Sequence, residues 1–232
     1  MRYRYIFILL WLPLAVQAME QNTQSTLLSL ERLDYWQSTD TDTDEDGMHW
    51  QARLKSGNGY DFFQLYSEGE RQNEEQQSRT RLLYQHAQSA YWDVLAGVEN
   101  TEAEKDENRL LLGVTGLAPY FVETGVRLLL SDEENSALEL ELGREWLFTQ
   151  KLVLELDTEW QFYAQKNAQM RHGDGLAESS IELVLGYEVQ REFMPYAGLY
   201  WHRAWGDTQE LLESGGEVDS DWGWRVGISC WY

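Results

Sequence analysis

The segment Lys151–Tyr163, with the sequence KLVLELDTEWQFY, decides the fold class because its two sets of alternate side chains differ in character. One set is apolar or aromatic apart from one threonine, and the other is mostly acidic: Leu152, Leu154, Leu156, Thr158, Trp160 and Phe162 against Val153, Glu155, Asp157, Glu159 and Gln161. A period of two places successive side chains on opposite faces of a β-strand, whereas a helix would scatter both sets around its circumference. The segment is therefore predicted to be a strand with one apolar and one polar face.

The same alternation recurs along the chain and predicts an all-β, antiparallel protein. Twelve strands are expected, within a range of 10 to 14, at approximately 26–36, 46–56, 60–68, 78–87, 90–99, 108–117, 120–131, 135–147, 151–163, 177–189, 194–205 and 220–232. The first and third have a broken alternation. A soluble β-sandwich would alternate as well, so the strands alone do not decide between a sandwich and a membrane barrel.

The connections favour a transmembrane β-barrel of the bacterial outer-membrane type. Long polar connections alternate with tight turns such as 57–59 and 118–119, and an even strand count with this asymmetry is typical of such barrels. Both termini are then expected on the periplasmic side and the long connections outside. These connections are rich in Asp and Glu, which predicts an acidic collar that includes Asp40, Asp42, Asp44, Glu74, Glu75, Glu102 and Glu104.

Aromatic residues support the membrane setting, since outer-membrane barrels carry aromatic girdles at both interfaces. The chain has 11 Trp and 13 Tyr, and several fall near predicted strand ends: Trp36, Trp92, Tyr120, Trp146, Trp160, Trp205 and Trp222. The last predicted strand alternates and ends on the aromatic Tyr232, as the closing strands of such barrels do.

The first 18 residues are typical of a secretory signal peptide that is cleaved after Ala18. Arg2 and Arg4 precede an apolar run that is too short to span a membrane as a helix. Residues 19–232 are then one domain, and loss of the two arginines moves the formal charge from -22 to -24. Such a charge excludes nucleic acid as a partner and favours cations. Cys230 has no second cysteine to pair with.

Closure of a barrel leaves the inward face free to be charged, because every backbone group is already hydrogen-bonded between strands. We expect a charge network that pairs across the interior and leaves a narrow or plugged lumen. Its predicted members are Arg53, Arg79, Arg81, Glu123, Arg127, Glu139, Glu141, Glu155, Asp157, Glu159, Glu182, Glu188 and Arg225.

Several stretches resemble the copper resistance protein B family of outer-membrane proteins: Leu82–Val98, Leu112–Phe121 (LGVTGLAPYF), Leu147–Leu154, Gly173–Leu185 and Tyr187–Asp207 (YEVQREFMPYAGLYWHRAWGD). The resemblance implies an outer-membrane barrel that binds or moves copper, contributes to copper tolerance and works beside a periplasmic multicopper oxidase. The chain departs from the family in one respect. Many members carry a Met- and His-rich segment before the barrel, whereas here Met19 leads almost directly into the first predicted strand.

Copper prefers thioether and imidazole ligands, and the predicted topology places five of them near the outer rim: Met48, His49, Met170, His172 and His202. Ordinary strand and loop residues without metal are the alternative. The run Asp40–Gly47 has some features of a calcium loop but lacks its central glycine and terminal Glu.

Two further function classes stay open. One is a lipid-modifying enzyme, for which the spacing His86-x-x-Ser89 is the nearest candidate, although it falls at a predicted periplasmic turn. The other is a structural or adhesive barrel, or one that attracts cations without copper specificity. We expect a monomer in contact with outer-membrane lipid, without enzymatic activity and without a tightly bound cofactor.

Overall fold

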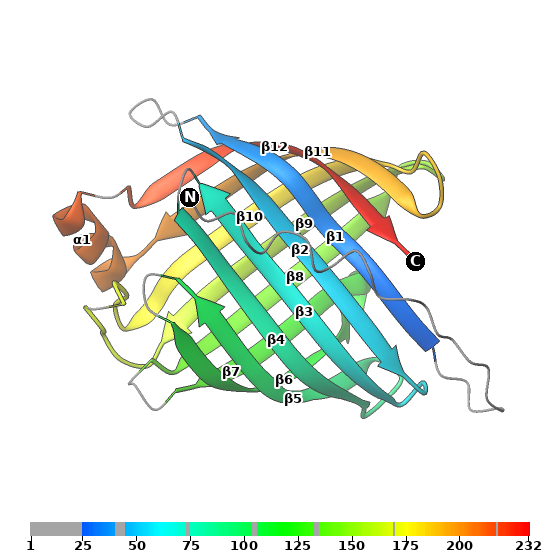
Figure 1. Ribbon diagram of the computed structural model, residues 1–232, viewed down its shortest axis with the longest axis horizontal. Helices are drawn as coiled ribbons and strands as arrows, with labels where there is room; N and C mark the ends of the chain where they lie inside the picture. Colours follow the sequence, from blue (N-terminus) through cyan, green and yellow to red (C-terminus); the bar gives the residue numbers. More distant parts are fainter. Residues whose placement is uncertain are drawn as a thin grey trace, which may run out of the picture.

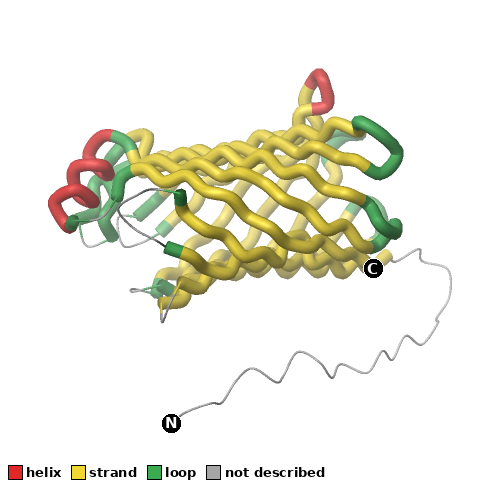
Figure 2. The backbone as a smooth tube through the Cα atoms, turned by 90° about the horizontal axis from the view of Figure 1, so that it is seen from above, coloured by secondary structure: helices red, strands yellow, loops and turns green. Residues whose placement is uncertain are grey.

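The computed structural model describes residues 25–39, 45–72, 75–103, 106–131, 135–168, 170–216 and 218–232. Within these residues, twelve antiparallel strands form a closed barrel in which each strand pairs with its sequence neighbours and the first pairs with the last (Figures 1 and 2). The strands are β1 Ser25–Ser38, β2 Asp46–Gly57, β3 Asp61–Gln72, β4 Glu75–Ala87, β5 Trp92–Glu102, β6 Glu107–Ala118, β7 Val122–Leu130, β8 Ala137–Leu147, β9 Leu152–Tyr163, β10 Gly175–Tyr187, β11 Phe193–Ala204 and β12 Ser220–Trp231. A 3-10 helix η1, Pro119–Phe121, and a helix α1, Gly206–Gly215, complete the order. The predicted fold class and strand count are confirmed.

The observed strand boundaries differ from the approximate predicted ones by at most four residues. β3 continues to Gln72 and β4 begins at Glu75, so the connection expected at 69–77 is mostly strand. The strand expected from residue 120 begins at Val122, because Tyr120 and Phe121 adopt positive φ angles of 67° and 59° in η1.

Residues 206–219 were expected to be an irregular connection, but α1 occupies most of them. The helix has an acidic residue, Asp207, in its first turn, where the helix dipole favours negative charge. It ends at Gly216, whose φ of 80° is a left-handed conformation that glycine adopts without strain. Among the described residues, no helix is both long and apolar enough to cross a membrane.

The burial of side chains is inverted relative to a soluble protein. Large apolar side chains lie exposed on the outer face, including Leu110, Leu112, Leu128, Leu138, Ile181, Leu183, Leu185, Leu199 and Val226. The inner face holds buried charged groups, among them Arg81, which is 3% exposed, and Glu139, which is 0% exposed. An apolar outer surface around a polar interior is the arrangement that a lipid bilayer requires of a barrel.

The two ends of the barrel differ in their connections. The tight turns gather at one end, whereas α1 and the connection between β9 and β10 lie at the other (Figures 1 and 2). The chain also ends beside the start of the barrel at the turn end, where Leu28 and Tyr232 exchange backbone hydrogen bonds of 3.0 and 2.8 Å. We call these the turn end and the loop end.

Candidate functional site

An irregularity in β1 places two adjacent charged residues inside the barrel. The pairing of β1 shifts register between Leu30 and Arg32 against β2, and between Leu30 and Leu33 against β12. A β-bulge of this kind opposes two residues to one and re-aims a side chain. As a result, Glu31 and Arg32 both line the lumen, which regular alternation would not allow.

One wall of the lumen carries a network of arginine and glutamate side chains from β3 to β8. Arg81 donates from Nε to Glu99 Oε2 and from Nη2 to Glu139 Oε2, each at 2.6 Å. Glu139 also accepts a hydrogen bond from Arg127, and Glu99 accepts one from Arg109 at 2.6 Å. Because both carboxylates are fully buried, this wall is held by charges that have several partners each rather than by single pairs.

A second network links β1 to β9, β10 and β12. Arg32 donates from Nη2 to Asp157 Oδ2 at 2.7 Å and from Nη1 to Glu182. Glu182 in turn pairs with Arg225 Nη1 at 3.0 Å, and Arg225 Nε lies 3.9 Å from Asp34 Oδ1. Strands β12, β11 and β10 separate β1 from β9 in the barrel, so the Arg32 side chain crosses part of the lumen.

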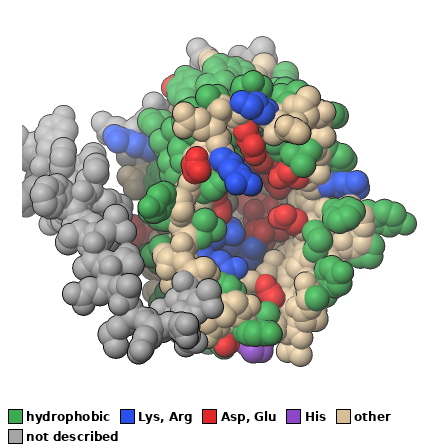
Figure 3. All heavy atoms as spheres, turned by 90° about the vertical axis from the view of Figure 1, so that its right-hand side faces the viewer, with side chains coloured by type: hydrophobic (Ala, Val, Ile, Leu, Met, Phe, Trp, Pro, Cys, Tyr) green, Lys and Arg blue, Asp and Glu red, His purple; other side chains and the backbone are tan. Residues whose placement is uncertain are grey.

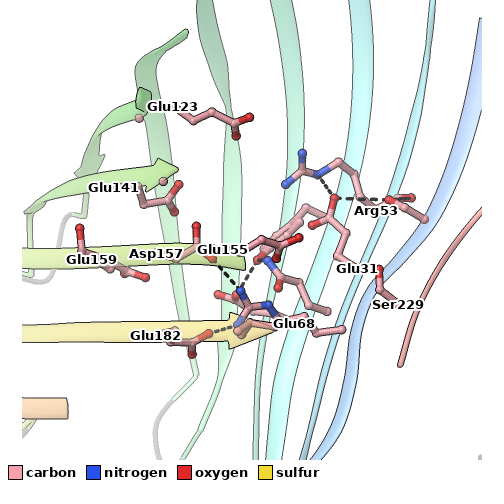
Figure 4. A pocket seen from close by; sticks show the side chains of 18 of the residues that line it. Glu31, Arg53, Glu68, Glu123, Glu141, Glu155, Asp157, Glu159, Glu182 and Ser229 are labelled. Atoms are coloured by element: carbon pink, nitrogen blue, oxygen red, sulfur yellow. Dashed lines mark hydrogen bonds and ion pairs between the residues drawn. The ribbon is translucent and has the colours of Figure 1, made fainter. Parts of the chain in front are cut away.

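The remaining space inside the barrel is strongly acidic. A cavity of about 590 Å³ is lined by three arginines, Arg32, Arg53 and Arg127, and by eight carboxylates, Glu31, Glu68, Glu123, Glu141, Glu155, Asp157, Glu159 and Glu182. Most of these carboxylates extend from one wall toward the space, with Arg53 and Glu31 opposite (Figure 4). A second cavity of about 450 Å³ shares part of this lining. Viewed at the turn end, acidic and basic side chains surround a central hollow (Figure 3).

The predicted charge network falls into two groups. Eight of its members take part in the two networks above or flank them: Arg79, Arg81, Arg127, Glu139, Glu141, Asp157, Glu182 and Arg225. Asp157 and Glu182 bind Arg32, and Arg53 pairs with Glu31 at 3.1 Å. Glu123, Glu155 and Glu159 line the large cavity, whereas Glu188 follows the end of β10.

Several inward-facing charges were not predicted from the sequence, namely Glu31, Arg32, Asp34, Glu68, Glu99 and Arg109. The alternation of β5 and β6 could have identified Glu99 and Arg109, because each shares a face with other inward residues. Arg32 could not have been found in this way, since the bulge reverses the parity of β1 at that position.

Two of the predicted copper ligands, His49 and His202, are histidines that each lie beside one carboxylate. His49 Nδ1 lies 3.3 Å from Asp34 Oδ2, and His49 also lines the large cavity. His202 Nε2 lies 3.6 Å from Glu178 Oε2. A carboxylate on one ring nitrogen orients the imidazole and leaves the other nitrogen available to a metal ion.

Met48 lies apart from His49 although the two are adjacent in sequence. Its side chain is 53% exposed on the outer face, because successive strand residues point to opposite sides. Met170 and His172 lie in the connection between β9 and β10. Within the described residues, no three His, Cys, Asp or Glu side chains are grouped closely enough to hold a metal ion. The structure therefore does not bring the five predicted ligands together in one site.

His172 belongs to a packed cap at the loop end. Its ring stacks on Tyr163 with centroids 3.6 Å apart and planes 7° apart, and only 3% of the residue is exposed. Burial lowers the pKa of His172 below its ordinary value, so the ring is held neutral. The next residue, Gly173, donates its amide to the hydroxyl of buried Thr208 on α1 at 2.8 Å.

The predicted acidic collar lies largely outside the described residues. This is the case for Asp40, Asp42, Asp44, Glu74 and Glu104, and hence for most of the run with features of a calcium loop. Glu75 begins β4, and Glu102 is exposed at the end of β5. The proposed signal peptide, residues 1–18, also lies outside the described part of the chain.

His86 and Ser89 lie at the turn end, and each has a different partner. His86 Nδ1 lies 2.7 Å from Asp61 Oδ1. The Ser89 hydroxyl accepts backbone hydrogen bonds from Tyr91 and Trp92 at 3.3 and 3.1 Å, which is the role of a turn-capping side chain.

The closed barrel, its apolar outer face and its charged lumen define the class of protein, a bacterial outer-membrane β-barrel. Solved structures agree on the fold. The NanC porin matches with a TM-score of 0.56 at 12% identity, covering 88% of this chain and 98% of that chain. Outer membrane phospholipase A from Escherichia coli matches with a TM-score of 0.55 at 14% identity, covering 87% and 92%. At these identities the likeness concerns the fold alone.

Comparison of sequences then shows the family. The family model of the copper resistance protein B precursor matches residues 25–232, and the chain belongs to that family. It is 30% identical to copper resistance protein B of Escherichia coli over 217 residues, 93% of this chain and 72% of the relative. It is 29% identical over 199 residues to a copper resistance protein B homolog of Pseudomonas syringae pv. tomato, covering 85% and 67%. The protein therefore has a copper-resistance role at the outer membrane.

Proposed function

We propose that the protein binds copper ions in its lumen and lets them pass along the barrel. The observation that carries this proposal is the pairing of His49 with Asp34 and of His202 with Glu178. His49 lines the acidic cavity, and His202 has the same parity on β11 as Met194 and Tyr196, which also line it. Each imidazole offers copper one nitrogen, and each carboxylate adds a negative charge beside it.

The charge of the lumen supports the same conclusion. Eight carboxylates against three arginines give the large cavity a formal excess of five negative charges, which concentrates cations within it. Walls of low dielectric strengthen this field compared with an open surface. Anionic solutes are disfavoured for the same reason.

The incomplete character of the sites also fits passage. Conduction requires ion binding that is favourable enough for entry and weak enough for release. Two separate pairs of one histidine and one carboxylate meet that requirement better than a closed shell of four ligands, which would retain the metal.

The experiment is copper(II) titration of the purified, refolded barrel, by calorimetry and by electron paramagnetic resonance. Replacing His49 and His202 together with Ala should weaken binding and remove the nitrogen hyperfine signal of the bound copper. The matched control is His86→Ala, since His86 also has an Asp partner but follows the outer-face parity of β4 and lies outside both cavities. Unchanged copper affinity in the double variant would refute the proposal.

Passage is tested separately with vesicles that enclose a fluorescent copper chelator. Wild-type barrel should quench the chelator after copper is added outside, and the double histidine variant should slow the quenching. Equal rates with barrel-containing and empty vesicles would exclude passage through the lumen.

We also propose that the turn end faces the periplasm, that cleavage follows Ala18 and that a periplasmic multicopper oxidase exchanges copper there with the monomeric barrel. The tight turns at that end are the feature that supports the orientation. A cysteine introduced at Asn58, in the β2–β3 turn, should resist a membrane-impermeant maleimide in intact cells and react after the outer membrane is opened.

A further inference from the structure

Asp157 and Glu182 face each other directly across the β9–β10 pair, and both line the lumen. Like charges in directly opposed positions of an antiparallel pair destabilise the sheet. The guanidinium of Arg32 lies between them, with Nη2 2.7 Å from Asp157 Oδ2 and Nη1 bound to Glu182 (Figure 4 labels both carboxylates). One cation supplied by β1, three strands away from β10 around the barrel, therefore reduces the repulsion between these two carboxylates.

Arg32 and Arg53 both line the large cavity, but their side chains extend in different directions. Arg53 pairs with Glu31 on the adjacent strand at 3.1 Å, so its side chain runs along its own wall. Arg32 starts from the bulge in β1 and contacts strands β9 and β10, with β11 and β12 between them and β1. Its side chain is 13% exposed and lines the large cavity, where it extends over part of the space that an ion would use.

A fixed guanidinium in the path opposes cations in two ways. It occupies the two carboxylates that would otherwise stabilise a cation at that level, and its own positive charge repels a cation nearby. Arg225, which also binds Glu182 at 3.0 Å, holds that carboxylate in place for Arg32. Breaking the contact needs movement of one side chain, while the barrel wall can stay unchanged.

We propose that Arg32 is the gate of the lumen: its bridge from β1 to Asp157 and Glu182 closes the cation path, and its release opens it. The inference rests on the proposed function for the identity of the ion, but closure by Arg32 applies to any small cation. It can therefore be tested without copper.

The test is the conductance of the purified barrel in planar lipid bilayers bathed in potassium chloride without copper. Arg32→Ala should raise the single-channel conductance several-fold over wild type and increase the preference for potassium over chloride. Arg53→Ala is the matched control, because it removes the same charge from the same cavity and leaves the bridge in place. It should change selectivity slightly and leave conductance near the wild-type value.

A second variant guards against loss of folding. Asp157→Asn with Glu182→Gln removes the acceptor charges and leaves the arginine, so it should free the Arg32 side chain and raise conductance less than Arg32→Ala does. Folding of each variant is checked by its heat-dependent shift in gel mobility. If Arg32→Ala does not fold, the conductance of the double variant decides whether Arg32 closes the lumen.

Two results would overturn the gate: equal conductance of Arg32→Ala and Arg53→Ala, or closed channels in Arg32→Ala and in the double variant. Neither result would bear on the copper-binding proposal, because copper binding is measured on the histidine variants. Conversely, a gate that opens in a barrel without copper affinity would leave Arg32 as the gate and refute the copper proposal.

Discussion

Replacing Arg81 with Ala should destabilise the barrel more than any other single loss of a lumen arginine. Arg81 contacts two carboxylates, Glu99 and Glu139, each at 2.6 Å, and both have fully buried side chains. Removing one partner of a buried ion pair costs about 3–5 kcal/mol because an uncompensated charge stays behind. Here Glu99 keeps Arg109 and Glu139 keeps Arg127, so the expected cost is at the lower limit, about 3 kcal/mol.

The loss of folding free energy can be measured by equilibrium unfolding in urea. The barrel is refolded into lipid vesicles and its unfolding is followed by tryptophan fluorescence. A loss of about 3 kcal/mol lowers the folding equilibrium constant roughly 100-fold. Arg53→Ala is the control, because its side chain is 38% exposed and has one salt-bridge partner, so its removal should cost less than about 1 kcal/mol.

A double-mutant cycle then tests the stated cause. If the unpaired charge of Glu139 accounts for the loss, adding Glu139→Gln to Arg81→Ala should cost less than Glu139→Gln costs alone. A loss below 1 kcal/mol for Arg81→Ala, or strict additivity in the cycle, would refute the view that these charges are effectively buried.

Three further predictions concern the cap and the outer face. Gly173→Ala should loosen the loop end and raise amide hydrogen exchange there, because an added Cβ would lie 2.4 Å from Asp207 Cβ; unchanged exchange would contradict the close packing. Burial lowers the pKa of His172, so the cap should be stable at neutral pH and lose stability as pH falls through about 6.5, the unfolded-state value. The protection factors of the cap amides, which correct for the slower intrinsic exchange at low pH, should fall between pH 7 and 5 in wild type, and His172→Phe should remove that fall. Leu112→Arg should cost about 2–4 kcal/mol in lipid vesicles, since the side chain lies on the outer face, and a cost near zero would place it outside the bilayer.

The fold followed from the sequence because a barrel with a charged interior has a strong period of two, as in Lys151–Tyr163. That pattern gives the face of each residue but not its partner in space. The contact between Arg32 and Asp157 joins residues 125 positions apart and depends on barrel closure and on a bulge. Helix α1 was missed because it is short and lies in a polar connection, and its two leucines, Leu211 and Leu212, are too few to indicate a period of 3.6 residues.

The sequence supplies candidate copper ligands by residue type, but it does not show which of them lie together. Parity along β2 separates Met48 from His49, which the residue types alone could not show. The partners of the two lumen histidines, Asp34 and Glu178, were not predicted, since neither lies within ten residues of its histidine in sequence. Long-range pairing of this kind is set by the order of strands and is absent from any local motif.

The buried charges also bear on how the strands find their register. A shift of one residue in the pairing of a strand turns every inward side chain to the outer face. Such a shift in β5 or β8 would move Glu99 or Glu139 from a lumen full of arginines into lipid, where a charge is costly. An apolar interior would impose no comparable penalty, because leucine is as well accommodated outside as inside. The buried charges of the lumen thus also restrict the barrel to one register, so Arg81→Leu should increase misassembled barrel as well as lower stability.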